Sequence, residues 1–124
     1  MKANYFLLAA SLNGFLAVAL GAFGAHGLKA RLSEHYLSVW QTAVQYQFYH
    51  ALALGLIALF LQRAVANSWL NASGYLMLVG IVFFSGSLYW LALGGPRWLG
   101  PVTPIGGVCF LIGWILLAIG ALRQ

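Results

Sequence analysis

Four long apolar stretches dominate the pattern of hydrophobic and polar positions along the chain. They cover residues 5–24, 43–61, 70–93 and 103–122. Each is near the roughly 20 apolar residues that a helix needs to cross about 30 Å of hydrocarbon. All six Lys and Arg residues fall outside these stretches, as the cost of a charge at the centre of a bilayer requires. The pattern therefore predicts an all-α, polytopic membrane protein in which the 124 residues form one four-helix bundle domain.

Turn-forming and capping residues lie beside the third and fourth stretches. Residues 94–96, Gly-Gly-Pro, favour the end of a helix, because glycine accepts a left-handed backbone and proline cannot continue the hydrogen-bond ladder. Thr103 followed by Pro104 is typical of an N-cap and a first helical position. Ser68 is the expected cap of the third helix.

Residues 33–42 differ from the apolar stretches because their polar side chains recur at a helical spacing. Glu34, Ser38, Gln41 and Gln45 fall within one narrow stripe at 100° per residue, and another side of the same helix is less polar. We therefore expect an amphipathic segment in the membrane interface. This segment either turns or runs straight into the second span.

The composition narrows the class of protein. Hydrophobic residues make up 63% of the chain and charged residues 6%, whereas a soluble domain carries about 25% charged residues. The formal net charge is +5, but the cations stand singly and form no patch, so they predict membrane-surface anchors and no nucleic-acid partner. With four spans the cations divide three and three between the two sides. Because Glu34 offsets one group, the positive-inside rule favours both termini in the cytoplasm.

Small residues mark candidate helix-packing positions. The fourth stretch carries Gly106, Gly113 and Gly120 at seven-residue intervals, and the first carries Gly14 and Gly21. Helices in lipid associate through close packing of small residues, so these glycines predict contacts within the bundle or between protomers. The alternative is close approach of a backbone to a ligand. A single copy would have little interior, which favours a homo-oligomer or a membrane-protein partner in addition to the lipid bilayer.

Polar side chains near the second span form the candidate functional site. They are His26, Gln41, Gln45, Tyr46 and His50. One interpretation is a structural network in which Gln41, Gln45 and Gln47 bond to Asn13, Ser85 or Ser87, and another is a polar pocket or pathway. A third interpretation is metal or haem ligation by His26 and His50, although no two histidines have the i, i+4 spacing of a helical metal pair and the chain has no Asp. Cys109 is the single cysteine, so no intrachain disulfide or Cys-rich metal site is possible.

A more specific signal comes from two segments, residues 21–28 with the sequence GAFGAHGL and residues 40–52 with the sequence WQTAVQYQFYHAL. They resemble the signature of domain-of-unknown-function family 423, which is similar to transmembrane protein 256 of animals. Residues 84–89, FSGSLY, and residues 100–107, GPVTPIGG, match its later half. The resemblance implies a small integral protein of about four helices in the bacterial inner membrane, and it implies no activity.

Three functional hypotheses follow. The first is a non-catalytic structural or accessory membrane subunit, since no GxSxG, HExxH, P-loop or dinucleotide motif is present and neither an enzymatic activity nor a cofactor is expected. The second is a small-solute or ion channel or transporter formed by a homo-oligomer. The third is haem, metal or quinone binding at His26 and His50.

Overall fold

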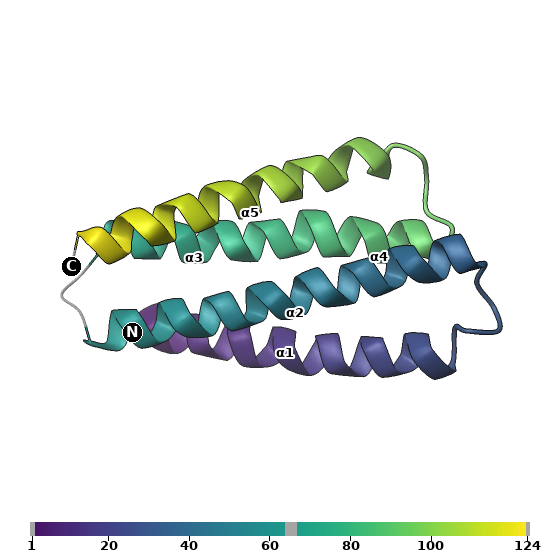
Figure 1. Ribbon diagram of the computed structural model, residues 1–124, viewed down its shortest axis with the longest axis horizontal. Helices are drawn as coiled ribbons and strands as arrows, with labels where there is room; N and C mark the ends of the chain where they lie inside the picture. Colours follow the sequence, from purple (N-terminus) through teal and green to yellow (C-terminus); the bar gives the residue numbers. More distant parts are fainter. Residues whose placement is uncertain (1, 64–66, 124) are drawn as a thin grey trace.

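The computed structural model describes residues 2–63 and 67–123, and within these ranges all regular structure is helical. The elements are α1 (Lys2–His26), α2 (Glu34–Arg63), α3 (Ser68–Gly80), the π-helical turn η1 (Ile81–Ser85), α4 (Gly86–Ala92) and α5 (Leu99–Leu122). The elements α3, η1 and α4 follow one another without a break and together form one rod, which is called the third rod below. With α1, α2 and α5 it makes four antiparallel rods (Figure 1). The predicted all-α, polytopic fold class is confirmed.

Each rod is long and apolar enough to cross a membrane. The four spans are Ala3–His26, Glu34–Arg63, Ser68–Ala92 and Leu99–Leu122, and an 18-residue segment within each has a mean hydropathy of 2.0, 1.4, 1.8 and 2.4, respectively. The second has 30 residues, which gives a helix of about 45 Å against about 30 Å of hydrocarbon. Of the two arrangements left open for residues 33–42, the chain therefore adopts the straight one, because α2 begins at Glu34 and continues unbroken. The position of this segment in the membrane interface stays a prediction.

The helix ends differ from two sequence-based expectations. Asn67, not Ser68, caps α3, because its side-chain oxygen accepts the backbone N–H groups of Trp69 and Leu70 at 3.0 and 3.2 Å. The last helix begins at Leu99, before the expected Thr103 cap, and Pro104 lies inside it. The Thr103 hydroxyl is directed sideways to Ser87 of α4, so it fixes the contact between two helices and caps neither.

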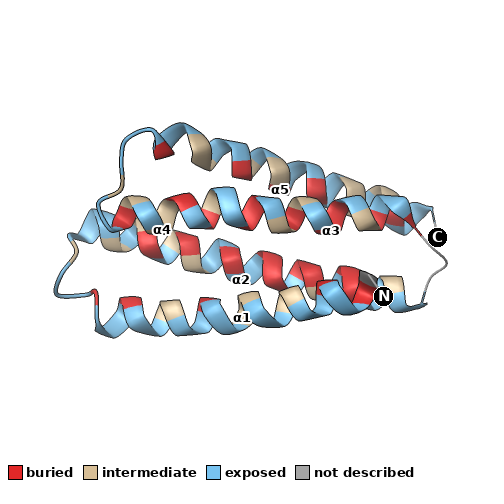
Figure 2. Cartoon of the chain, turned by 180° about the vertical axis from the view of Figure 1, so that it is seen from behind, coloured by how far each residue is buried: buried red, intermediate tan, exposed pale blue. Residues whose placement is uncertain are grey.

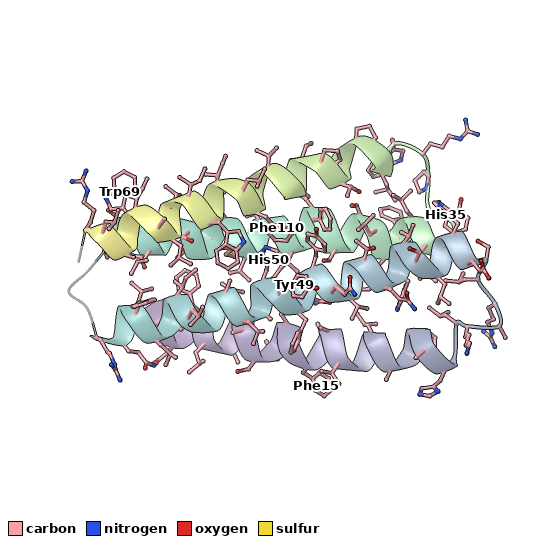
Figure 3. All side chains as sticks on the ribbon, in the orientation of Figure 1. Phe15, His35, Tyr49, His50, Trp69 and Phe110 are labelled. Carbon is pink, nitrogen blue, oxygen red and sulfur yellow. The ribbon has the colours of Figure 1, made fainter. Side chains whose placement is uncertain are left out.

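The four rods are not packed equally. Helix α1 rests on α2, and α5 rests on α3 and η1, while α2 joins these two pairs. Figure 2 shows the result: most of α1 is exposed, and the buried residues concentrate where α2 faces the third rod. Phe15 of α1 points outward with 70% of its surface exposed (Figure 3). Helix α1 is therefore a peripheral helix held chiefly by α2, and Phe6 near its start also contacts Gly74 and Tyr75 of α3.

The buried apolar residues form two clusters at different levels of the bundle. The smaller cluster, near the loops that follow α1 and α4, contains Leu28, Trp40 and Ala92. The larger cluster connects all four rods, and its buried members are Phe6, Ala53, Leu54, Ile57, Ala58, Leu70, Met77, Ile81 and Phe110.

The three α5 glycines at seven-residue intervals lie against the third rod. A Cβ at Gly106 would overlap the backbone of Phe83 and Phe84 in η1, and one at Gly120 would lie 2.6 Å from Leu70. A Cβ at Gly113 would lie 3.3 Å from the end of the Met77 side chain. The backbone of α5 therefore approaches the third rod as closely as it can.

The two α1 glycines that the sequence marks as candidate packing positions, Gly14 and Gly21, differ in their surroundings. A Cβ at Gly21 would lie 3.2 Å from Val44 of α2, whereas one at Gly14 would meet nothing within 4 Å. Gly14 thus faces open space beside α2, although its sequence signal resembles that of the α5 glycines.

Candidate functional site

His50 lies halfway along α2, on the side that faces α5, and is buried (Figure 3). Its Nδ1 is 2.7 Å from the Tyr46 carbonyl oxygen, and its Nε2 is 3.1 Å from the Trp114 indole nitrogen. A carbonyl can only accept and an indole N–H can only donate. The hydrogen-bond partners therefore assign the proton to Nδ1 and the acceptor lone pair to Nε2, which gives a neutral imidazole with both nitrogens engaged.

Aromatic rings surround this histidine. The His50 ring stacks on Phe110 of α5 with 3.5 Å between centroids and an interplanar angle of 8°. Tyr46 contacts Phe84 of η1 at 4.5 Å, and Trp114 meets the imidazole edge-on at 5.9 Å. The space between α2 and α5 is thus filled by side chains.

A second network starts from Gln47, one turn earlier on α2. Its amide nitrogen donates to the Asn13 side-chain oxygen of α1 at 3.0 Å, and its amide oxygen accepts from the Tyr89 hydroxyl of α4 at 2.7 Å. Asn13 in turn donates to the Ala9 carbonyl at 2.9 Å. The network joins three helices and ends on a backbone carbonyl, so it is complete within the protein.

Further interhelical bonds run from a side chain to a backbone carbonyl. Trp40 of α2 donates to Leu20 of α1 at 2.9 Å, and Ser85 of η1 donates to Ala43 of α2 at 2.8 Å. The same bond type links α3 to α5, from Ser73 to Gly113 at 2.6 Å. In lipid such bonds strengthen helix contacts that hydrophobic burial alone does not drive.

The five predicted site residues do not form one site. His26, Gln41 and Gln45 lie apart from the other two, at the end of α1 and on the outer side of α2. Tyr46 and His50 do lie together, because the carbonyl of one accepts from the ring of the other. The other residues around Tyr46 and His50 are Phe84 of η1 and Phe110 and Trp114 of α5.

A metal, haem or quinone site shared by His26 and His50 is wrong on geometry. Gly24 packs against Trp40, which aligns these levels of α1 and α2. His26 lies two residues from Gly24 toward the loop, and His50 lies ten residues from Trp40 in the opposite direction. At 1.5 Å per residue they are about 18 Å apart along the bundle. The Trp114 N–H also occupies the Nε2 lone pair that a ligand bond would need.

Gln47 is not among the five predicted site residues, and neither Tyr89 nor Trp114 stands out in the sequence as a partner. The structure, and not a sequence signal, separates Gln47 from Gln41 and Gln45. The buried residues of α2 recur every three or four positions, at Trp40, Ala43, Gln47, His50, Leu54 and Ile57. This spacing places Gln47 and His50 on the inner face of the helix.

An open furrow follows the seam between α1 and α2. One part of about 500 Å³ is lined by small residues, including Ala10, Gly14 and Gly55, and by larger apolar residues such as Phe48 and Leu52. A second part of about 300 Å³ continues past Phe48 to Gly21 and includes Gln45. The furrow therefore contains Gln45 and both of the α1 glycines that the sequence singled out.

The four apolar spans and the interhelical polar bonds between them define a multi-pass α-helical membrane protein. A family model described as "Protein of unknown function (DUF423)" matches residues 20–107. The chain belongs to this family, and the resemblance seen in the sequence is confirmed.

Curated relatives carry the name UPF0382 membrane protein. The one from Staphylococcus epidermidis strain RP62A is 51% identical over 95% of each chain. Another, from Staphylococcus saprophyticus, is 50% identical over 95% of this chain and 97% of its own. The protein YwdK of Bacillus subtilis is 45% identical over 95% of this chain and 96% of its own. No solved structure matches the chain.

Proposed function

We propose that the protein is a non-catalytic accessory subunit of a larger membrane assembly, and that the α1–α2 furrow receives a transmembrane helix of another membrane protein. The observation that carries the proposal is the open furrow beside Gly14, on the rod whose principal neighbour is α2. At the other four glycines that the sequence marks as candidate packing positions, an added Cβ would lie within 3.3 Å of a neighbouring atom.

The lining of the furrow suits a helix. Ala10 and Gly14 of α1 face Ala51 and Gly55 of α2, so a third backbone can approach both helices closely. Close approach gains van der Waals contact, which drives helix association where lipid tails are as apolar as leucine. Gln45 adds an amide that can donate and accept across the new contact.

The buried polar groups support a non-catalytic role. Both nitrogens of His50 and both amide atoms of Gln47 are engaged within the protein. A reactive or ligand-binding role would require these bonds to break. Their present partners hold α2 to the other three rods, which is a structural task.

A solute or ion pathway through Gln45 and His50 receives less support. The two residues are five positions apart on α2, which places them about 140° apart around the helix. Gln45 lines the furrow beside α1, and His50 stacks on Phe110 of α5. A pathway would need both side chains to line one passage.

The proposal includes a location. We propose the bacterial inner membrane, with both termini in the cytoplasm, because Glu34 lowers the positive charge at the opposite end of the bundle. A reporter fused after Gln124 tests the orientation: fluorescence of a protein that folds only in the cytoplasm is expected, and activity of a periplasmic phosphatase would contradict it.

Photocrosslinking in native membranes tests the docking. A photoreactive phenylalanine analogue at Leu52, on the exposed rim of the furrow, is expected to capture a distinct membrane protein. The matched control position is Leu111 of α5, which is similarly exposed but lies outside the furrow. Filling the furrow with Gly14→Leu is expected to abolish the adduct without unfolding the protein, since open space surrounds Gly14.

Three results would overturn the proposal. Adducts of equal yield from Leu52 and Leu111 would show random collision. Adducts from Leu52 to a second copy of this chain alone would replace an accessory role with self-association. A Leu52 variant that captures lipid and no protein would mean that hydrocarbon fills the furrow.

A further inference from the structure

Four of the tryptophans divide into two groups by the use of their indole N–H. Trp40 and Trp114 donate to acceptors inside the protein, the Leu20 carbonyl and His50 Nε2. Trp90 and Trp98 are exposed, and within residues 2–63 and 67–123 neither indole N–H has an acceptor. Their rings meet edge to face, with centroids 5.5 Å apart and planes at 84°.

This tryptophan pair stands at the end of a short groove between the third rod and α5. The groove has a volume of about 350 Å³, and its apolar walls include Val82, Phe83 and Val102, with space above Gly86. The Ser87 hydroxyl on its wall is already bonded to Thr103 and to the Phe84 carbonyl. The groove therefore offers hydrocarbon surface below and free indole donors at one end.

The same end of the bundle is positively charged. Arg97 precedes Trp98 directly and is exposed, and no ion pair involves it within the part of the chain that the structure describes. The loop after α1, which carries Lys29 and Arg31, lies at this end as well (Figure 1). Glu34 is the single acidic residue of the whole sequence. An anion at the groove end would meet attraction from several cations.

The length of the groove selects its occupant. From Val82 to Trp90 the helical rise is about 12 Å, much less than the roughly 30 Å over which a transmembrane helix would pack. A flexible acyl chain can fill so short a groove and leave it again. The α1–α2 furrow, in contrast, follows α2 from Val44 to Leu59 and offers about twice that length.

We propose that this groove is a binding site for an anionic phospholipid. One acyl chain lies between α4 and α5, and the phosphate accepts from the indole N–H groups of Trp90 and Trp98 while pairing with Arg97. Arg and Trp are the residues that favour headgroup depth. The site is independent of the α1–α2 furrow, so it stands or falls without the proposed partner.

Native mass spectrometry of delipidated protein in mild detergent tests the site. Phosphatidylglycerol and phosphatidylcholine with identical acyl chains are added in equal amounts. A basic residue near a membrane surface contributes about 1 kcal/mol toward an anionic lipid, which corresponds to about a fivefold preference for phosphatidylglycerol. Arg97→Gln is expected to remove this preference, and Arg123→Gln, the same charge change at the opposite end, is expected to preserve it.

Two further variants distinguish the contribution of the lipid's acyl chain from that of its headgroup. Gly86→Leu fills the groove and is expected to lower binding of both lipids, with thermal unfolding of the purified variant as the check on its fold. Trp98→Phe keeps an aromatic ring but loses the donor, so it is expected to reduce the preference for the anionic lipid by a smaller factor than Arg97→Gln.

The outcomes are decisive in either direction. Equal loss of preference in Arg97→Gln and Arg123→Gln would overturn the site in favour of general attraction to a cationic protein. Displacement of the bound lipid by soluble glycerol phosphate would show that free phosphate suffices and that the groove holds no chain. Retention of lipid in a folded Gly86→Leu variant would also reject the groove.

Discussion

Helices α1 and α5 carry the same sequence signal and use it differently. Both are apolar spans with small residues along one side, yet Gly106, Gly113 and Gly120 of α5 contact the third rod while Gly14 of α1 faces open space. Helix α5 lies against α3 and η1, and α1 has α2 as its principal neighbour. A stripe of small residues thus marks where close helix packing is possible, and the packing partner need not be a helix of the same chain.

The π-helical turn accounts for part of the difference. At η1 the backbone of the third rod adopts the wider i→i+5 turn of a π-helix, and Gly106 of α5 fits against Phe83 and Phe84 there. Ser85 of the same turn donates to Ala43 of α2. One local irregularity therefore joins α5 and α2 to the third rod, whereas α1 is α-helical from Lys2 to His26.

The largest expected effect comes from filling the α5 contact. Gly106→Val would place side-chain atoms against the η1 backbone, which cannot move aside as a flexible side chain can. We expect a loss of ~3 kcal/mol in unfolding free energy, at the upper end of overpacking costs. The measurement is reversible unfolding by SDS titration in mild detergent. The matched control is Gly107→Val, where a Cβ makes an ordinary contact of 3.9 Å with Phe84; equal stability of the two variants would refute the close approach.

The next largest effect concerns the bond network that holds α1 in place. Gln47→Leu removes the partner of both Asn13 and Tyr89. We expect a loss of about 1.5 kcal/mol, because two polar groups are left unpaired in an apolar interior. Gln45→Leu, on the furrow side of the same helix, is expected to change the unfolding free energy by less than about 0.5 kcal/mol. A similar loss in both variants would mean that Gln47 has no special role.

A smaller effect is expected for the link between α2 and α5. In a double-mutant cycle with His50→Leu and Trp114→Phe, the coupling energy should be about 0.6 kcal/mol, the average for transmembrane side-chain hydrogen bonds. The same cycle with Trp69→Phe, an exposed tryptophan on α3, should give additive changes. Additivity in the Trp114 cycle would show that the indole bond contributes nothing.

The smallest effect returns to the open side of α1. Gly14→Ala should raise the unfolding free energy by up to about 1 kcal/mol, because alanine favours a helix and open space receives its methyl group. Gly113→Ala on α5 has the same gain in helix propensity but must displace the end of Met77, 3.3 Å away. The α5 variant should therefore be the less stable of the two in parallel thermal unfolding, and the reverse order would contradict the comparison.

The roles of the polar residues on α2 could be predicted from the sequence only in part. Glu34 does begin the helix, and the helix does continue into the second apolar stretch. An interhelical network does include a glutamine, and Asn13 is one of the partners that the sequence offers for it. The glutamine is Gln47, one of the three that the sequence offers for such a network, whereas the candidate site contained Gln41 and Gln45. The reason is that the inner face of α2 is set by α1 and α4, which approach it from other parts of the chain.

Four membrane-spanning helices, with the cations placed beyond the apolar stretches, follow directly from the sequence. These are local properties, since the length of an apolar stretch needs only to match the thickness of the hydrocarbon. Three features depend on how the helices pack: His26 and His50 lie far apart, Gln47 faces inward, and α1 is open where α5 is filled. The physical reason is that lipid and protein interior are both apolar, so hydrophobic periodicity along a span does not mark which face turns inward.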